Sequence, residues 1–204
     1  MVRCEAWLLK GLLGLTWLLP ILMSHLTPVP CSSLETLKDQ LNSTLRRRYL
    51  KHNFPINYTM QVPYEEVFRL KNISKLKNDS ASERDLQVLW ATVTEKSIDR
   101  ILQVLPERHP TRRKYLTNLK DLFKVILESN PELRILDESK SESIENILTH
   151  LKDEDYQGWK SVKPKSLLDN CYRTMHCIFN ECFSGNSTDY CQTQHWRKGK
   201  EEQG

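Results

Sequence analysis

The sequence predicts an all-α fold, a short-chain four-helix bundle with up-up-down-down topology and a small two-stranded β ribbon in its crossovers. Two observations lead to this prediction. Apolar residues recur at steps of three and four over four long segments, which is the spacing of one face of an α-helix. The first and last pairs of segments are joined by long connections and the middle pair by a short one. That pattern of connections is typical of an up-up-down-down bundle.

The first two helices are read from their apolar stripes and their ends. Residues 32–49 are predicted to form the first helix. The second starts near Ser80, because Ser80 and Glu83 have the spacing of a capping box, and Pro106 stops it. The first stripe consists of Leu34, Leu37, Leu41 and Leu45.

Prolines mark the other two helices. Pro110 opens the third, because proline suits the first turn of a helix, and the Asn-Pro pair at 130–131 closes it. Pro164 opens the fourth in the same way. A shorter helix precedes it, with Ser139 and Glu142 at capping-box spacing.

The long connections each contain one extended piece. Residues 57–62 and 159–162 lack helical periodicity, and we expect them to pair as a ribbon. A two-stranded ribbon is marginal alone, so it must pack on the bundle. Residues 71–80 are polar, basic and predicted to form a surface loop.

The first 24 residues are predicted to be a signal peptide. Arg3 and Lys10 precede an apolar run at residues 11–26, which is short for a membrane span and is interrupted by Pro20. An N-terminal membrane anchor is the alternative. We expect residues 25–192 to form the folded domain and 193–204 a disordered polar tail.

Charge and hydropathy limit the partners of the mature chain. Without residues 1–24 it has 28 basic and 25 acidic residues, a net charge of +3. This is too mild to indicate nucleic acid. Residues beyond 26 contain no apolar run long enough for a membrane span, so we expect a soluble protein secreted to the extracellular space.

Six cysteines become informative once secretion is expected. Cys4 leaves with the signal peptide, one remaining cysteine begins the mature chain, and four cluster near its end. In an oxidising compartment this pattern indicates disulfides. Zinc is the rival reading, but the C-x-x-C pairs of zinc sites are absent.

Bundle geometry then selects the pairs. Cys171 and Cys182 would lie about 16 Å apart on one helix, whereas a disulfide requires Cα atoms within about 7 Å. The start of the first helix meets the end of the fourth in this topology, so we predict Cys31–Cys182, with Cys177–Cys191 holding the tail. Cys171 is then a buried free thiol, unless it forms an intermolecular bond.

Sequons also support secretion, because N-x-[ST] is the acceptor pattern for N-glycosylation. The predicted sites are Asn42, Asn57, Asn72, Asn78 and Asn186. Asn57 is the weakest of them, because it falls in the first extended piece.

Signatures of catalysis and of metal or cofactor binding are missing. The histidines are scattered, and HExxH, G-x-S-x-G and P-loop patterns are absent. His176 lies beside Cys177, but a cysteine among three others in a secreted chain is normally oxidised. The acidic run at 153–155 lacks calcium-loop spacing and is read as a solvated turn. We therefore expect no enzyme and no cofactor.

Three basic groups, 46–51, 112–114 and 197–200, have two readings. They are either solvated helix ends or a surface that binds sulfated glycosaminoglycan through salt-sensitive electrostatics.

The segment 51–70 is rich in aromatic residues and contains two prolines. Most of it is expected to pack the first crossover on the bundle. Its tip, Phe54-Pro55-Ile56, is predicted to contact a second copy of the chain.

Several short stretches resemble one family. KHNFPINY at 51–58, VPYEEVFR at 62–69, SERDLQVLW at 82–90, and KPKSLLDNCYRTM at 163–175 resemble interleukin-34, as does the His-Pro…Lys-Tyr-Leu start of the third helix. The resemblance spans about residues 31–191. The missing proline-rich tail, the different cysteine spacing and the extra sequons suggest a vertebrate source distant from mammals.

The resemblance implies a homodimeric short-chain helical cytokine that binds and dimerises the macrophage colony-stimulating factor receptor. The implied result is survival, proliferation and differentiation of monocytes and macrophages. The implied contact residues lie on the first helix, the end of the second and the start of the third. They are Gln40, Asp99, Arg100, Gln103, Glu107 and Asn118. The alternative is a proteoglycan- or matrix-binding helical protein without a signalling receptor.

Overall fold

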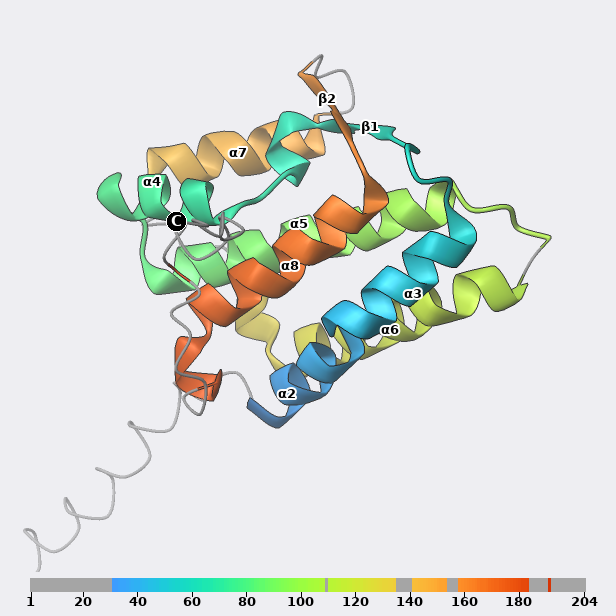
Figure 1. Cartoon of the computed structure of the whole chain (residues 1–204). Helices are drawn as coiled ribbons and strands as arrows, with labels where there is room; N and C mark the ends of the chain where they lie inside the picture. The colour runs from blue at the N-terminus through green and yellow to red at the C-terminus, as the bar shows by residue number, and fades with distance from the viewer. Residues whose placement is uncertain (1–30, 109, 135–140, 154–157, 184–190, 192–204) are drawn as a thin grey trace, which may run out of the picture.

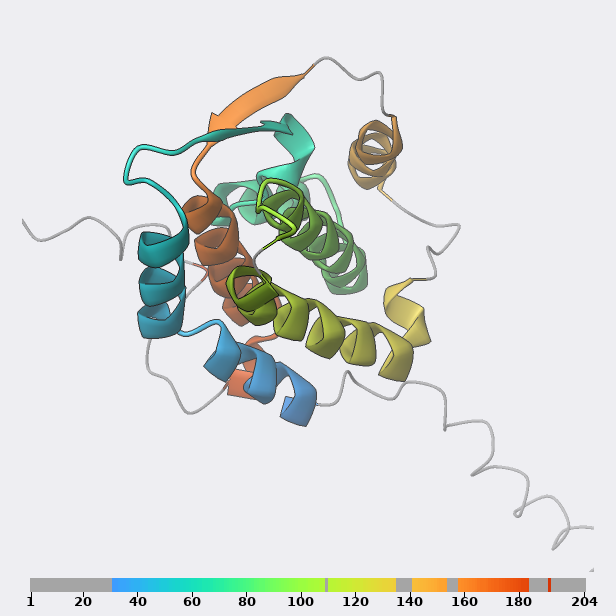
Figure 2. The ribbon, with the colours of Figure 1, turned by 90° about the vertical axis from the view of Figure 1, so that its right-hand side faces the viewer.

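The computed structural model describes residues 31–108, 110–134, 141–153, 158–183 and 191. Within these ranges the chain is mostly helical with one small antiparallel sheet (Figure 1). The bundle consists of α2 (Cys31–Gln40) with α3 (Ser43–Asn53), α5 (Glu83–Gln103), α6 (Pro110–Ser129) and α8 (Pro164–Ile178). Figure 2 shows these helices gathered around a common interior.

Pairs of contacting residues give the direction of each helix. Cys31 joins Cys182 and Arg46 meets Asp169, so α2 and α3 run antiparallel to α8. Gln40 meets Tyr115 and Asp99 meets Lys120, so α6 runs antiparallel to both α2 and α5. The helices α2–α3 and α5 are therefore parallel, as are α6 and α8. This is the predicted up-up-down-down order.

The first helix is broken, whereas the sequence predicted one continuous helix over 32–49. The break lies at Leu41–Asn42. Asn42 is the N-cap of α3, and its Oδ1 accepts a 2.9 Å hydrogen bond from the backbone N–H of Leu45. A side chain that satisfies the backbone in this way competes with helix continuation.

The predicted ribbon is present at one end of the bundle (Figure 1). Strand β1 (Met60–Pro63) pairs antiparallel with β2 (Trp159–Val162), with Met60 opposite Val162. The second piece has the predicted bounds, whereas the first begins three residues later than expected. Val62 is fully buried, which anchors the ribbon on the core.

The predicted surface loop at 71–80 is wrong. Residues Leu70–Asn78 form helix α4, whose Leu70, Ile73 and Leu76 are buried and which contacts α8. These three apolar residues lie at steps of three, but the polar residues between them, Lys71, Asn72, Ser74 and Lys75, give the stretch the composition of a loop. Burial of this narrow stripe stabilises a helix that composition alone does not favour.

Two helix starts also differ from the prediction. Ser82, not Ser80, caps α5, and it forms a reciprocal capping box with Asp85. Ser80 instead has a left-handed backbone with φ of 65°. Helix α7 (Glu142–Lys152) has Ser141 as N-cap. The predicted cap of that helix, Ser139, lies outside the described residues.

Short 3₁₀ segments complete the connections: η2 (Tyr64–Glu66), η3 (Pro131–Leu133) and η4 (Asn180–Phe183). Helix α7 contacts η2 and α5, so the second crossover lies over the first. In the described part of the chain, no helix is both long and apolar enough to cross a membrane.

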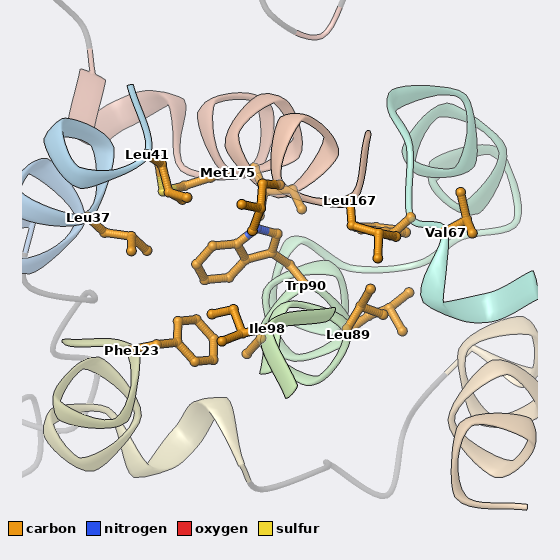
Figure 3. Close-up of a cluster of buried hydrophobic side chains, with 14 of the residues drawn as sticks. Leu37, Leu41, Val67, Leu89, Trp90, Ile98, Phe123, Leu167 and Met175 are labelled. Carbon is orange, nitrogen blue, oxygen red and sulfur yellow. The ribbon is translucent and has the colours of Figure 1, made fainter. Parts of the chain in front are cut away.

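Trp90 lies at the centre of the core and is fully buried (Figure 3). Its ring meets Phe123 and Phe179 edge to face, with centroids 5.5 and 5.1 Å apart. Its Nε1 donates a 3.2 Å hydrogen bond to the carbonyl of Cys171. This one side chain therefore connects α5, α6 and α8, and its polar atom is satisfied where water cannot reach.

Candidate functional site

The residues that the resemblance implies for receptor contact come from α2, α5, α6 and the connection after α5. Gln40 and Asn118 are exposed. Tyr115 Oη donates a 2.7 Å hydrogen bond to the carbonyl of Gln40, which holds the end of α2 against α6. Asn118 follows Tyr115 by three positions, so the two lie on the same side of α6. The fold thus brings Gln40 and Asn118 to neighbouring positions.

Asp99, Gln103 and Glu107 follow one another along the end of α5 and into its connection with α6. Asp99 forms an ion pair with Lys120 of α6, and both side chains are partly exposed. Gln103 lies one turn further on and is exposed, as is Glu107. Of the two acidic residues, Asp99 is already paired with Lys120, whereas the described residues show no ion-pair partner for Glu107.

Arg100 is directed elsewhere. Its Nε lies 3.1 and 3.3 Å from the two carboxylate oxygens of Glu66 in η2. The Glu66 side chain is 1% exposed and that of Arg100 is 35% exposed. Burial raises the pKa of Glu66, and the positive charge of Arg100 opposes that shift. The geometry gives Arg100 a structural role, holding the first crossover on α5.

Two of the three predicted basic groups lie together. Tyr49 Oη donates a hydrogen bond to the carbonyl of Arg112, and its ring lies 4.6 Å from that of Tyr115. Burial raises the pKa of Tyr49 to about 12, so it keeps its proton. This contact holds α3 against the start of α6, so the helix segments that carry the exposed Arg47, Arg48 and Arg112 lie close together. The third group, 197–200, lies outside the described residues.

Arg46 does not belong to that basic surface. It is 5% exposed, and its Nε lies 2.9 Å from Oδ1 of Asp169 on α8. Its guanidinium also lies over the ring of Tyr172, 4.6 Å from the centroid. Arg46 is therefore part of the contact between α3 and α8, and reading the whole run 46–51 as a surface was wrong at this position.

Pro55 and Ile56 of the Phe54-Pro55-Ile56 tip are exposed, and the tip forms one side of an open groove. Ile56 is 85% exposed, whereas Phe54 is half-buried with its ring 5.2 Å from that of Tyr58. The groove has a volume of about 280 Å³. It is lined by Arg47, Leu50, Lys51, Phe54, Pro55, Ile56, Tyr58, Lys163, Pro164 and Lys165.

Both disulfides join the pairs expected from the sequence. Cys31 binds Cys182, with Cα atoms 5.1 Å apart, and Cys177 binds Cys191, with Cα atoms 4.8 Å apart. Cys171 is a buried free thiol. Burial raises the pKa of Cys171 to about 11. A thiol that stays protonated at neutral pH is a poor nucleophile, so none of the five cysteines that the structure describes offers a reactive thiolate.

Metal ligands do not gather in the described ranges, where no group of three His, Cys, Asp or Glu side chains could hold an ion. Residues 154–155 of the acidic run lie outside those ranges. His176, the partner considered for a Cys–His pair, is 2% exposed and packs between the rings of Tyr172 and Phe183, with centroids 4.5 and 4.2 Å away.

A model of one protein family matches most of the chain: interleukin 34, over residues 25–187. The chain belongs to the interleukin-34 family. This is a family of cytokines and not of enzymes, and the helical bundle with its small antiparallel sheet fits a helical cytokine. The matched region contains every residue that the resemblance implied for receptor contact.

In this interleukin-34 chain the sequons lie on different structural elements. Asn57 and Asn78 are exposed, and Asn57 precedes β1 instead of lying within it. Asn42 and Asn72 use their Oδ1 atoms in helix capping, with Asn72 accepting a 3.0 Å hydrogen bond from the Arg69 N–H. Asn186 lies outside the described residues.

Proposed function

We propose that this interleukin-34 family member is a secreted, glycosylated homodimer that binds the macrophage colony-stimulating factor receptor. Each protomer binds one receptor chain, and the dimer brings two kinase domains together, which promotes the survival, proliferation and differentiation of monocytes and macrophages. Bivalency is the mechanism, because the second contact forms at a high effective concentration. The observation that carries this proposal is the family match across the bundle.

The proposal includes the processing of the chain. Residues 1–24 act as a signal peptide, residues 25–192 form the cytokine domain and residues 193–204 form a polar tail. N-glycans attach at some of Asn42, Asn57, Asn72, Asn78 and Asn186. Two disulfides fit an oxidising compartment and support secretion.

Receptor contact is proposed at Gln40, Asp99, Gln103, Glu107 and Asn118. The guanidinium of Arg100 is already paired with Glu66, so Arg100 is kept in this set only because its side chain is 35% exposed. Acidic side chains at the end of α5 would attract a positively charged receptor surface and so speed the encounter of the two proteins. Glu107 is the sharpest candidate, because it is exposed and no ion pair within the described chain occupies it.

The test is charge reversal. Glu107→Lys with Asp99→Lys should weaken binding to the receptor ectodomain at least tenfold by surface plasmon resonance. The matched control is Glu145→Lys, an exposed acidic position on α7. Unchanged binding by the double variant would remove this face from the proposal.

A second candidate function is attachment to sulfated glycosaminoglycan. It is favoured by the proximity of the α3 and α6 basic groups, which the Tyr49–Arg112 hydrogen bond produces. A chain that elutes from heparin only at high salt, but forms no complex with the receptor, would favour the matrix-binding alternative.

A further inference from the structure

The break between α2 and α3 carries the sequon Asn42-Ser43-Thr44. Ser43 and Thr44 are exposed in the first turn of α3, and Asn42 is half-buried. N-glycosylation uses this tripeptide as its acceptor and leaves a bulky group at the protein surface. The position of the break on the bundle therefore decides which surface a glycan at Asn42 covers.

The capping role of Asn42 leaves one amide hydrogen for the sugar. Its Oδ1 accepts the 2.9 Å hydrogen bond from the backbone N–H of Leu45. Its Nδ2 donates a hydrogen bond to the carbonyl of Asp39, 2.6 Å away. An amide nitrogen carries two hydrogens, and the described residues provide an acceptor for only one of them. A sugar that replaces the other hydrogen is therefore compatible with the N-cap of α3.

Asn42 lies beside one part of the proposed receptor contact. Gln40 precedes it by two positions, so their Cα atoms lie within about 8 Å of each other. The 2.7 Å hydrogen bond from Tyr115 Oη to the carbonyl of Gln40 holds this end of α2 on α6. Asn118 follows Tyr115 on the same side of α6. A bulky group on Asn42 therefore lies next to the corner that Gln40 and Asn118 form.

The other described sequons lie away from that corner. Asn72 and Asn78 belong to α4, which contacts α8 and ends shortly before α5 begins. Asp99 lies about 24 Å along α5 from the first residue of that helix, at a rise of about 1.5 Å per residue. In Figure 1 and in Figure 2, α4 lies well away from the break between α2 and α3. Asn57 follows the end of α3 that is opposite to Asn42.

We propose that an N-glycan at Asn42 regulates receptor binding by covering the corner formed by Gln40 and Asn118. This inference rests on the proposed function, because it concerns access to the same contact. A receptor chain that approaches the corner must displace and order the glycan, which costs conformational entropy and slows association. Asp99 and Glu107 lie along the end of α5, so the glycan is expected to lower the affinity and not to abolish binding.

The proposed dimer contact lies at the other end of α3. Asn42 and Phe54 flank this helix and are separated by about 18 Å along its axis. A glycan at Asn42 can therefore coexist with a second copy of the chain at the Phe54-Pro55-Ile56 tip. The regulated step is the binding of each protomer to its own receptor chain.

The test uses the intact protein secreted from eukaryotic cells, with the occupancy of Asn42 measured by mass spectrometry of the glycopeptide. Thr44→Ala removes the sequon and keeps Asn42 as the N-cap. Thr44 is exposed and has no assigned receptor contact, so the fold should be unchanged. By surface plasmon resonance, this variant should bind the receptor ectodomain at least fivefold more tightly than the wild type, with faster association.

Ser74→Ala is the matched control, because it removes the sequon of Asn72 at an exposed position on α4. Its affinity for the receptor should equal that of the wild type. Enzymatic removal of all N-glycans should strengthen binding by the wild type and leave binding by Thr44→Ala unchanged. An equal gain in both proteins would place the effect at another sequon and overturn the inference.

Two further results would overturn the inference and leave the proposed function intact. One is a receptor-binding wild type that carries no glycan at Asn42. The other is equal receptor affinity of the wild type and Thr44→Ala while Asn42 is occupied. A folded Thr44→Ala protein that does not bind the receptor even without N-glycans would contradict the proposed function itself, and the inference would fall with it.

Discussion

Arg100 of α5 lies against the carboxylate of Glu66, a side chain that is 1% exposed, with Nε 3.1 Å from Oε1. This pair joins α5, the longest described helix, to η2 in the first crossover, and Glu66 belongs to the family-like stretch VPYEEVFR. A charge as buried as that of Glu66 is stable only with its partner present. Arg100 therefore has a role within the fold that does not depend on contact with a receptor.

Replacing Arg100 by leucine should lower the free energy of unfolding by about 2–4 kcal/mol, because it removes the ion-pair partner of the buried Glu66 and leaves only the weaker influence of Lys96. This range lies below the about 3–5 kcal/mol typical of a fully buried ion pair, because the Arg100 side chain is one-third exposed. Urea unfolding measures the loss. The double variant Arg100→Leu with Glu66→Leu should recover part of it, and no recovery would show that the pair does not explain the loss.

His176 should make the protein less stable in mild acid. The pKa of His176 is lowered to about 4, mainly by burial and also by the charges of Lys38 and Arg46, while Glu35 opposes the shift. The unfolded chain, with an ordinary histidine pKa of about 6.5, takes up the proton first as the pH falls. The contribution to stability is therefore complete above about pH 6.5 and is lost between pH 6.5 and 4.

Between pH 7.5 and 5 the expected loss from this histidine is about 2 kcal/mol. Glu66 acts in the opposite direction, because its raised pKa favours the folded state as the carboxyl becomes protonated. Denaturant unfolding of the wild type and of His176→Leu at each pH separates the contribution of His176 from that of Glu66. Parallel pH profiles for both proteins would exclude His176 as the cause.

The two disulfides should contribute unequally to stability. Cys31–Cys182 spans 151 positions and Cys177–Cys191 spans 14. A longer closed loop restricts the unfolded chain more, with about 3 kcal/mol for a 15-residue loop and nearly 5 for one of 100. Serine substitution of the first pair should therefore lower the free energy of unfolding more than substitution of the second. Equal losses would contradict this account.

Ile56 offers a test of the proposed dimer contact that leaves the fold intact, because its side chain is 85% exposed. Ile56→Asp should shift the protein to monomer at concentrations where the wild type is a dimer, as measured by sedimentation velocity. Val125→Asp on α6 is the control, since Val125 is 52% exposed and lies away from the tip in sequence. A dimeric Ile56→Asp protein would place the contact elsewhere.

The sequence predicted much of the bundle because its signals are local. Pro110 and Pro164 begin α6 and α8 as expected, and Pro106 follows the end of α5. The ribbon was also predictable, since both extended pieces interrupt helical periodicity. These features depend on residues near one another in the chain, and local geometry determines them.

The wrong or missing predictions concern local signals that compete with one another and contacts between residues far apart in the sequence. Asn42 interrupts a leucine stripe that reads as one helix, and α4 buries three apolar residues within a basic stretch. Arg46 is the same residue type as its neighbours Arg47 and Arg48, but its side chain pairs with Asp169, 123 positions away in the sequence. Its spacing of four from buried Leu50 was the available signal. Receptor contacts left no pattern of their own, so only the resemblance suggested them.

The stoichiometry of the receptor complex is the most direct test of the proposed function. The secreted protein, purified from eukaryotic cells, should be measured by light scattering alone and with the receptor ectodomain of its own species. The account predicts a dimer that binds two receptor chains in a two-plus-two complex. A correctly folded protein that forms no complex, or a single protomer bound to a single receptor, would contradict it.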